Sequence, residues 1–176
     1  MSKITIRTLT SPGTTAALPA LADILSDCVE GGASVGFMSP YTPQDAMPYW
    51  QGVAQAVAEG STVLIVAEKD DEILGTVQLG IGMMPNQPHR ADLKKLLVHR
   101  KARGLGLSRL LIEAAEEAAS RHGRHVLVLD TATGSPAETI YEKFGWQRVG
   151  VIPQYALMPD GSYCGSTFFY KTLAAD

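Results

Sequence analysis

The sequence predicts an α+β fold, a mixed β-sheet flanked by helices, and three observations support this class. Segments with the alternating or β-branched pattern of strands are interspersed with segments whose apolar residues recur at helical spacing. The 176 residues, 45% of them hydrophobic, suffice for one hydrophobic core. No repeat, linker or low-complexity stretch divides the chain. We therefore expect a single domain over residues 1–176.

The first half of the chain is predicted to contain a strand, two helices and a hairpin. Turn-forming residues 11–13 end the first strand, and Gly31 and Gly32 terminate the first helix. Thr42 is a helix cap followed by proline at the first helical position. The predicted elements are a strand over 4–9, a helix over 18–29, a helix from 42 to a stop at Gly60, and strands over 62–67 and 73–81.

The second half alternates between strands and helices more regularly. A strand, a basic turn, an amphipathic helix and a further strand follow one another, which is the pattern of a right-handed crossover between parallel strands. Gly145 ends a short helix before the last two strands. The predicted elements are a strand over 92–98, a helix from near Leu105, a strand over 126–130, a helix over 136–144, and closing strands over 146–151 and 166–173.

The basic turn is the most informative feature for function. A buried strand at 96–98 runs into a turn containing Gly104 and Gly106, and the helix that follows offers its free N–H groups and the positive end of its dipole. Between Lys94 and Arg109 there are six basic residues and no acidic one, although the chain carries a formal charge of −3. The junction therefore predicts a binding site for an anion such as a phosphate.

The spacing within this turn distinguishes between nucleotide motifs. A Walker loop, G-x-x-x-x-G-K-[ST], is absent, and the third glycine of a dinucleotide fingerprint is missing. The pattern R-x-x-G-x-[G/A] does fit from Arg103 through Gly106, with Ser108 in place of the usual Gly or Ala. This pattern resembles the pyrophosphate-binding motif of the GNAT acetyltransferases. The resemblance implies acetyl-CoA as acyl donor, bound by Arg103, Gly104, Leu105, Gly106, Leu107 and Ser108.

Two further places carry the resemblance. Asp92 stands six residues before Val98, where that family often has a carboxylate, and residues 137–146 reproduce A-x-x-x-Y-x-x-x-G-[FW]. The frequent Asn three residues before this segment is Gly134 here. The resemblance implies a mostly antiparallel seven-stranded sheet with about four helices, splayed between the fourth and fifth strands. The splay would leave backbone groups of Leu96, Leu97 and Val98 for the amide-bearing arm of coenzyme A.

A narrower resemblance, to the tabtoxin-resistance branch of the family, is spread over nearly the whole chain. It is carried by segments such as GGASVGFM at 31–38, LDTATGSPAE at 129–138, PDG at 159–161 and FFYKTL at 168–173. It implies acetylation of a small amino compound, such as an amino-acid-like or β-lactam toxin or antibiotic. The small residues at 31–38 would leave room for this acceptor, which we expect to contact Gly32, Ser34, Phe37 and Met38.

Acetyl transfer from a thioester to an amine requires a neutral nucleophile and a proton for the departing thiolate. Tyr141 is the expected acid, because a phenol with a pKa of about 10 keeps its proton at neutral pH. Asp92 and Asp130, near the ends of neighbouring strands, are candidate bases, and either would need burial or a water relay. Each also has an ordinary structural interpretation: Tyr141 in the core, Asp130 capping a loop, and Asp92 paired with Arg90 or Lys94.

Other function classes fit less well. Residues 32–36 match the G-x-S-x-G elbow of serine hydrolases at Ser34, but helical residues precede that serine where a strand is required. A non-catalytic acyl-CoA sensor would keep the glycine turn without needing Tyr141 or the aspartates. Neither Cys28 nor Cys164 has a basic neighbour that would favour an acyl intermediate.

The remaining expectations concern partners. The histidines form no HExxH pair, so we expect no metal, and the negative net charge argues against nucleic acid. No stretch approaches the ~20 apolar residues of a membrane span, and the N-terminal residues lack a leader pattern. We expect a cytoplasmic enzyme with a small-molecule amine acceptor and no membrane partner, and a homodimer is left open.

Overall fold

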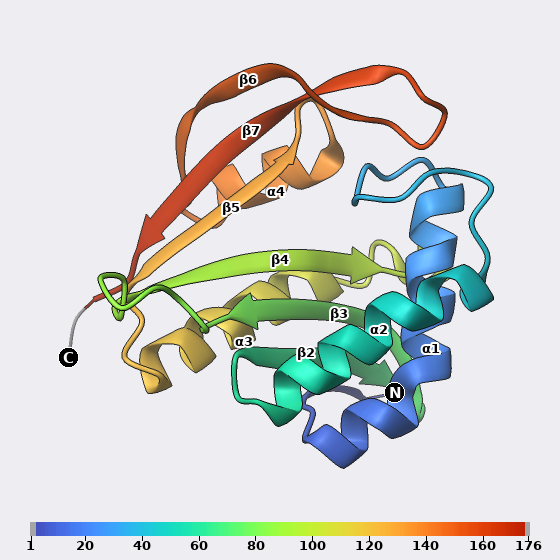
Figure 1. Cartoon of the computed structure of the whole chain (residues 1–176), viewed down its shortest axis with the longest axis horizontal. Coiled ribbons are helices and arrows are strands. Elements are labelled where there is room, and N and C mark those ends of the chain that lie inside the picture. Colours follow the sequence, from blue (N-terminus) through green and yellow to red (C-terminus); the bar gives the residue numbers. More distant parts are fainter. Residues whose placement is uncertain (1–2, 175–176) are drawn as a thin grey trace.

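In the computed structural model, which describes residues 3–174, the chain forms one seven-stranded sheet with helices on both faces (Figure 1). The elements are β1 (Ile4–Thr8), α1 (Ser11–Glu30), α2 (Pro43–Ala58), β2 (Thr62–Lys69), β3 (Glu72–Gly80), β4 (Arg90–Val98), a short 3-10 helix (Arg100–Ala102), α3 (Leu107–Arg121), β5 (Val126–Ala132), α4 (Pro136–Lys143), β6 (Gln147–Leu157) and β7 (Tyr163–Thr172).

The strand order is β1-β2-β3-β4-β5-β7-β6, and only the pairing of β4 with β5 is parallel. That pairing covers three residues, Arg90 to Asp92 opposite Val126 to Val128, after which the two strands diverge. Figure 1 shows β5, β7 and β6 as an arm that leans away from the β1–β4 half. The predicted fold class and the splay between the fourth and fifth strands are therefore confirmed.

Both faces of the sheet are covered, which explains why β2 is buried along most of its length. Leu64 and Val66 belong to the core beneath α1 and α2, whereas Val63 and Ile65 belong to the core that includes α3 and α4. This alternation is the two-residue repeat of a strand buried on both sides. No helix within residues 3–174 combines the length and the apolar character that a membrane crossing requires.

Helix boundaries follow from local chemistry, and two differ from expectation. Residues 11–13 do not merely end the first strand; they open α1, whose cap is Thr10 with its side chain accepting a hydrogen bond from the Gly13 N–H. The helix expected near Leu105 begins at Leu107 instead, because Gly106 has a φ of 77° and leaves the helical region. The start of α2 is as predicted, with a capping box between Thr42 and Asp45.

Of the last two strands, β6 is much longer than predicted, whereas β7 begins three residues before its predicted start and ends one residue before its predicted end. β6 extends to Leu157, and its residues are exposed along almost their whole length. An exposed edge strand needs no alternation of apolar and polar residues, so its pattern gave no signal. Gln154, at a φ of 51°, lies where the pairing of β6 with β7 shifts register.

Candidate active site

The glycine turn lies between the end of β4 and the start of α3. Gly104 and Gly106 have φ values of 80° and 77°, a conformation that side-chain-bearing residues rarely adopt. A Cβ built at either position meets no atom within 4 Å, so the space in front of the turn is open. The cap at Gly106 makes no side-chain hydrogen bond. The first N–H groups of α3 are thus available to an anion that enters this space.

A carboxylate on α1 binds the segment that leads into this turn. Asp27 accepts hydrogen bonds from the backbone N–H of Arg100 at 2.8 Å and from its Nε at 2.9 Å. Burial by itself would raise the pKa of Asp27, but the hydrogen bonds from Arg100 outweigh it and lower the pKa. Asp27 is therefore a charged anchor that fixes the turn relative to α1.

The gap between β4 and β5 opens beyond Asp92, the last residue of β4 that pairs with β5. The predicted cofactor-arm residues lie in the part of β4 that has diverged. Leu97 is buried in the core under α1 and α2, and Leu96 and Val98 pack on the opposite core. Their side chains are used for packing, while the side of the strand that faces β5 has no strand partner. Backbone groups at such an edge can hydrogen-bond an extended ligand.

Tyr141 projects from α4 into the core beside β7. Its ring centroid lies 5.7 Å from that of Trp146 and 6.0 Å from that of Phe169. Burial raises the pKa of Tyr141 far above its usual value, and the charge of Asp130 adds to this effect. Within residues 3–174 its hydroxyl makes no hydrogen bond, yet it is not among the fully enclosed polar atoms. The hydroxyl therefore keeps its proton, and although Tyr141 is buried, the hydroxyl is not fully enclosed.

The two candidate bases lie at the fork of the splay. Asp92 is opposite Val128 in the last pair between β4 and β5, and Asp130 follows two residues later on β5. The Asp92 side chain is 44% exposed and 3.6 Å from Arg90, while exposed Asp130 accepts a hydrogen bond from Ser166 at 2.7 Å. Neither carboxylate is buried, so proton transfer by either would go through water.

The segment between α1 and α2 reaches across to the β6–β7 hairpin (Figure 1). The Ser34 hydroxyl donates to the Leu157 carbonyl at 2.8 Å, and the Ser39 N–H donates to the Pro159 carbonyl at 3.1 Å. Of the other predicted acceptor residues, Gly32 has a φ of 90° and Met38 is 44% exposed. The segment thus bridges the two halves of the molecule on the side of the splay.

Ser34 has a structural partner instead of a catalytic one. Besides its bond to the Leu157 carbonyl, it accepts a hydrogen bond from the Cys164 thiol at 3.6 Å. It follows α1 and precedes α2 at Pro43, so the strand-to-helix elbow of a serine hydrolase is absent here. Cys28 donates to the Val98 carbonyl, and burial raises the pKa of its thiol to about 11. Neither side chain is presented as a nucleophile.

Lys95 is a residue of this region that the sequence analysis did not single out. It has a φ of 52° at a β-bulge in β4. Its Nζ lies 5.9 Å from the ring centroid of Phe37 and 5.6 Å from that of Tyr49. Burial lowers the pKa of Lys95. The sequence contains a signal for this residue. Leu93, Lys95 and Leu97 occupy alternate positions of the strand, and the lysine stands where the pattern calls for an apolar residue.

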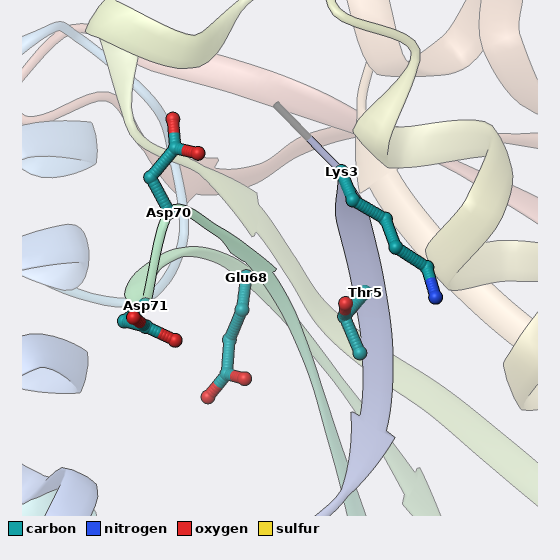
Figure 2. Close-up of a pocket in the computed structure, with 5 residues that line it drawn as sticks. All are labelled: Lys3, Thr5, Glu68, Asp70 and Asp71. Atoms are coloured by element: carbon teal, nitrogen blue, oxygen red, sulfur yellow. The ribbon is translucent and has the colours of Figure 1, made fainter. Parts of the chain in front are cut away.

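The described residues also form a polar depression at the far edge of the sheet. Figure 2 shows the residues that line it: Lys3, just before β1, Thr5 in β1, Glu68 near the end of β2, and Asp70 and Asp71 in the β2–β3 turn. None of these residues belongs to the predicted site. No cluster of side chains suited to a metal ion occurs within residues 3–174.

Comparisons with known proteins agree with this geometry. A family model described as an acetyltransferase (GNAT) domain matches residues 33–155. An N-acetyltransferase of Azospirillum brasilense is 35% identical over 112 residues, which cover 62% of this chain and 65% of that relative. The chain thus matches slightly less than two thirds of this relative's length.

Solved structures share the fold over nearly the whole chain. An N-acetyltransferase from Staphylococcus aureus superposes with a TM-score of 0.81 at 20% identity, covering 98% of this chain and 100% of that one. A ribosomal-protein-alanine N-acetyltransferase from Brucella melitensis gives 0.78 at 26% identity, covering 96% and 99%. A Salmonella typhimurium structure determined with its cofactor acetyl-CoA gives 0.78 at 19% identity, covering 98% and 95%.

Proposed function

Because the chain belongs to the GNAT acetyltransferase family, we propose that it is an acyltransferase that moves an acetyl group from acetyl-CoA to the amine of a small acceptor. The observation that carries this proposal is the junction of β4 with α3, where an open glycine turn continues the unpaired edge of a splayed strand. These two features suit the two parts of coenzyme A, an anionic pyrophosphate and an amide-bearing arm. The related Salmonella typhimurium structure contains acetyl-CoA.

The residues support direct transfer within a ternary complex. The acceptor nitrogen forms a bond to the thioester carbonyl carbon, and the carbon–sulfur bond breaks. The proton of the amine passes through water toward Asp92 or Asp130, and Tyr141 donates its proton to the leaving sulfur and regains one from solvent. Burial of Tyr141 favours this role because it keeps the phenol protonated. No covalent acyl-enzyme is needed, which agrees with the raised pKa of the Cys28 thiol.

We further propose that the acceptor is amino-acid-like, with a β-lactam of the tabtoxin type as the leading candidate within the tabtoxin-resistance branch. The resemblance of residues 31–38 to that branch supports this, together with the aromatic wall of this segment. The ring of Phe37 lies 4.8 Å from that of Tyr41 and 5.3 Å from that of Tyr49. A wall of this kind suits a small ligand better than an extended peptide.

The acceptor proposal is tested by comparing substrates. Purified protein with acetyl-CoA is assayed by thiol release against amino acids, tabtoxinine-type lactams, polyamines, antibiotics and lysine-containing peptides. We expect the highest kcat/KM for a small amino-acid-like amine, and a lower value in Phe37→Ala. Better use of peptides, or no effect of Phe37→Ala on any acceptor, would contradict the assignment. Binding of acetyl-CoA by calorimetry without turnover of any amine would instead favour the sensor function.

A further inference from the structure

One charged side chain near the proposed acceptor segment has no counter-charge in contact. Lys95 lies in the bulge of β4, where its pairing with β3 shifts register between Thr76 and Gln78. The bulge changes the phase of the strand: Ala91 and Leu93 face the core that includes α3, and after the extra residue Leu96 and Val98 face it as well. Bulges of this kind re-aim a side chain and occur next to active sites.

The bulge directs Lys95 to the opposite face, beside the segment between α1 and α2. Its ammonium lies within 6 Å of two aromatic rings, those of Phe37 and Tyr49. A Cβ built on Gly36 would come 3.7 Å from the same Nζ. Tyr49 is itself fixed, because its hydroxyl accepts a hydrogen bond from buried Gln78 at 2.9 Å. The lysine therefore lies against two aromatic rings, of which that of Tyr49 is fixed by a hydrogen bond.

The ammonium group lacks an acceptor for its N–H donors. Within residues 3–174 no carboxylate lies within 4.0 Å of it, and it makes no hydrogen bond. Asp130 acts on it only from a greater distance and already accepts a hydrogen bond from Ser166. Lys95 is half-buried, so its ammonium group has lost part of its hydration, and ring faces compensate for only part of that loss.

We propose that Lys95 binds an anionic group of the acceptor, a carboxylate in an amino-acid-like substrate, and thereby determines acceptor specificity. The inference rests on the proposed function. A carboxylate would supply the missing acceptor, and an α-amino acid bound this way would present its amine near the gap between β4 and β5, where Asp130, the carboxylate whose charge acts on Lys95, lies on β5. The phosphates of coenzyme A are a less suitable occupant, because the arm residues 96–98 separate Lys95 from the glycine turn.

The test compares acids with their amides. Wild type, Lys95→Met and Lys95→Arg are assayed with acetyl-CoA against a panel of α-amino acids and the matching amino-acid amides. We expect wild type to prefer the acids, and Lys95→Met to lose at least tenfold in kcat/KM for acids while changing little for amides. Lys95→Arg should restore part of the preference, since it keeps the charge. Lys94→Met is the matched control, because Lys94 is the adjacent lysine of β4 but is exposed.

Each alternative gives a different result. Equal use of acids and amides by wild type, or use of neither while acetyl-CoA still binds, overturns the inference. An equal loss for both classes without rescue by arginine would make Lys95 a base instead of an anion site. Weaker acetyl-CoA binding in Lys95→Met would assign it to the cofactor. Failure of wild type to bind acetyl-CoA in calorimetry would refute the proposed function itself, so the two failures are distinguishable.

Discussion

At the scale of single residues, burial keeps Tyr141 protonated, as a proton donor requires. Its raised pKa means that the phenol keeps its proton well above neutral pH. We expect Tyr141→Phe to lower kcat by about 10- to 1000-fold while the affinity for acetyl-CoA changes little, since only a proton donor is removed. Steady-state kinetics and calorimetry measure the two quantities. An unchanged kcat would remove Tyr141 from the chemistry.

The raised pKa of Tyr141 also determines how the reaction rate should respond to alkaline pH. Burial disfavours the phenolate, so ionisation of Tyr141 should cause no loss of rate below pH ~10. An alkaline limb at lower pH must then come from another group, and it should persist in Tyr141→Phe. Disappearance of such a limb in the variant would show that the tyrosine titrates there.

The aspartates differ in their surroundings. Asp92 is near Arg90, and Asp130 is held by Ser166. If one of them accepts the amine proton through water, its replacement by asparagine should reduce the rate most at low pH, where the acceptor amine is most fully protonated. Full pH–rate profiles of Asp92→Asn and Asp130→Asn measure this. Wild-type rates in both variants at every pH would favour a non-catalytic role for the two carboxylates.

At the scale of elements, Gly106 at the start of α3 has two roles: it adopts a positive φ, and it leaves open the space that a ligand would enter. Gly106→Val places a branched side chain at a φ of 77°, at a strain cost of about 1–3 kcal/mol, and also fills the open space in front of the turn. Gly123 provides a matched control, because it has a φ of 68° and equally open space just beyond the other end of α3. Both variants should lose thermal stability.

The difference between these variants lies in binding. We expect Gly106→Val to weaken acetyl-CoA binding at least tenfold by calorimetry, and Gly123→Val to bind as wild type does. Similar affinities in the two variants would show that the glycine turn at 103–108 is not the pyrophosphate site.

How far sequence predicts an element depends on what the element packs against. The start of α2 was predictable because Thr42 and Pro43 are local signals, and the crossover from β4 through α3 to β5 follows from hydrophobic periodicity. The length of β6 was not predictable, because an exposed edge strand is under no demand for alternation. The bulge at Lys95 results from pairing with β3, which is a non-local contact. Its only trace in the sequence is a lysine at a position of the strand where an apolar residue is expected.

For the whole molecule, the sheet is least continuous at the junction between its two halves, β1–β4 and β5–β7. β4 and β5 pair over only three residues each, and the segment between α1 and α2 adds contacts to the β6–β7 hairpin. The glycine turn and the free edge of β4 lie on one side of the gap, and Asp130 and Tyr141 lie on the other. A ligand that fills the gap would therefore contact both halves and couple them.

This coupling leads to a prediction for acetyl-CoA. At a free concentration of about 100 times Kd, it should stabilise the fold by about 2.7 kcal/mol, seen as a rise in Tm. Hydrogen exchange should slow in β4 at residues 96–98 and also in β5 and α4, because bridging suppresses the motion of one half against the other. At the same ligand concentration both effects should be smaller in Gly106→Val, since a tenfold weaker Kd removes about 1.3 kcal/mol of the stabilisation, whereas Gly123→Val should keep them. Protection confined to the turn at 103–108 would mean that the ligand binds one half only, and that the splay is not where its arm lies.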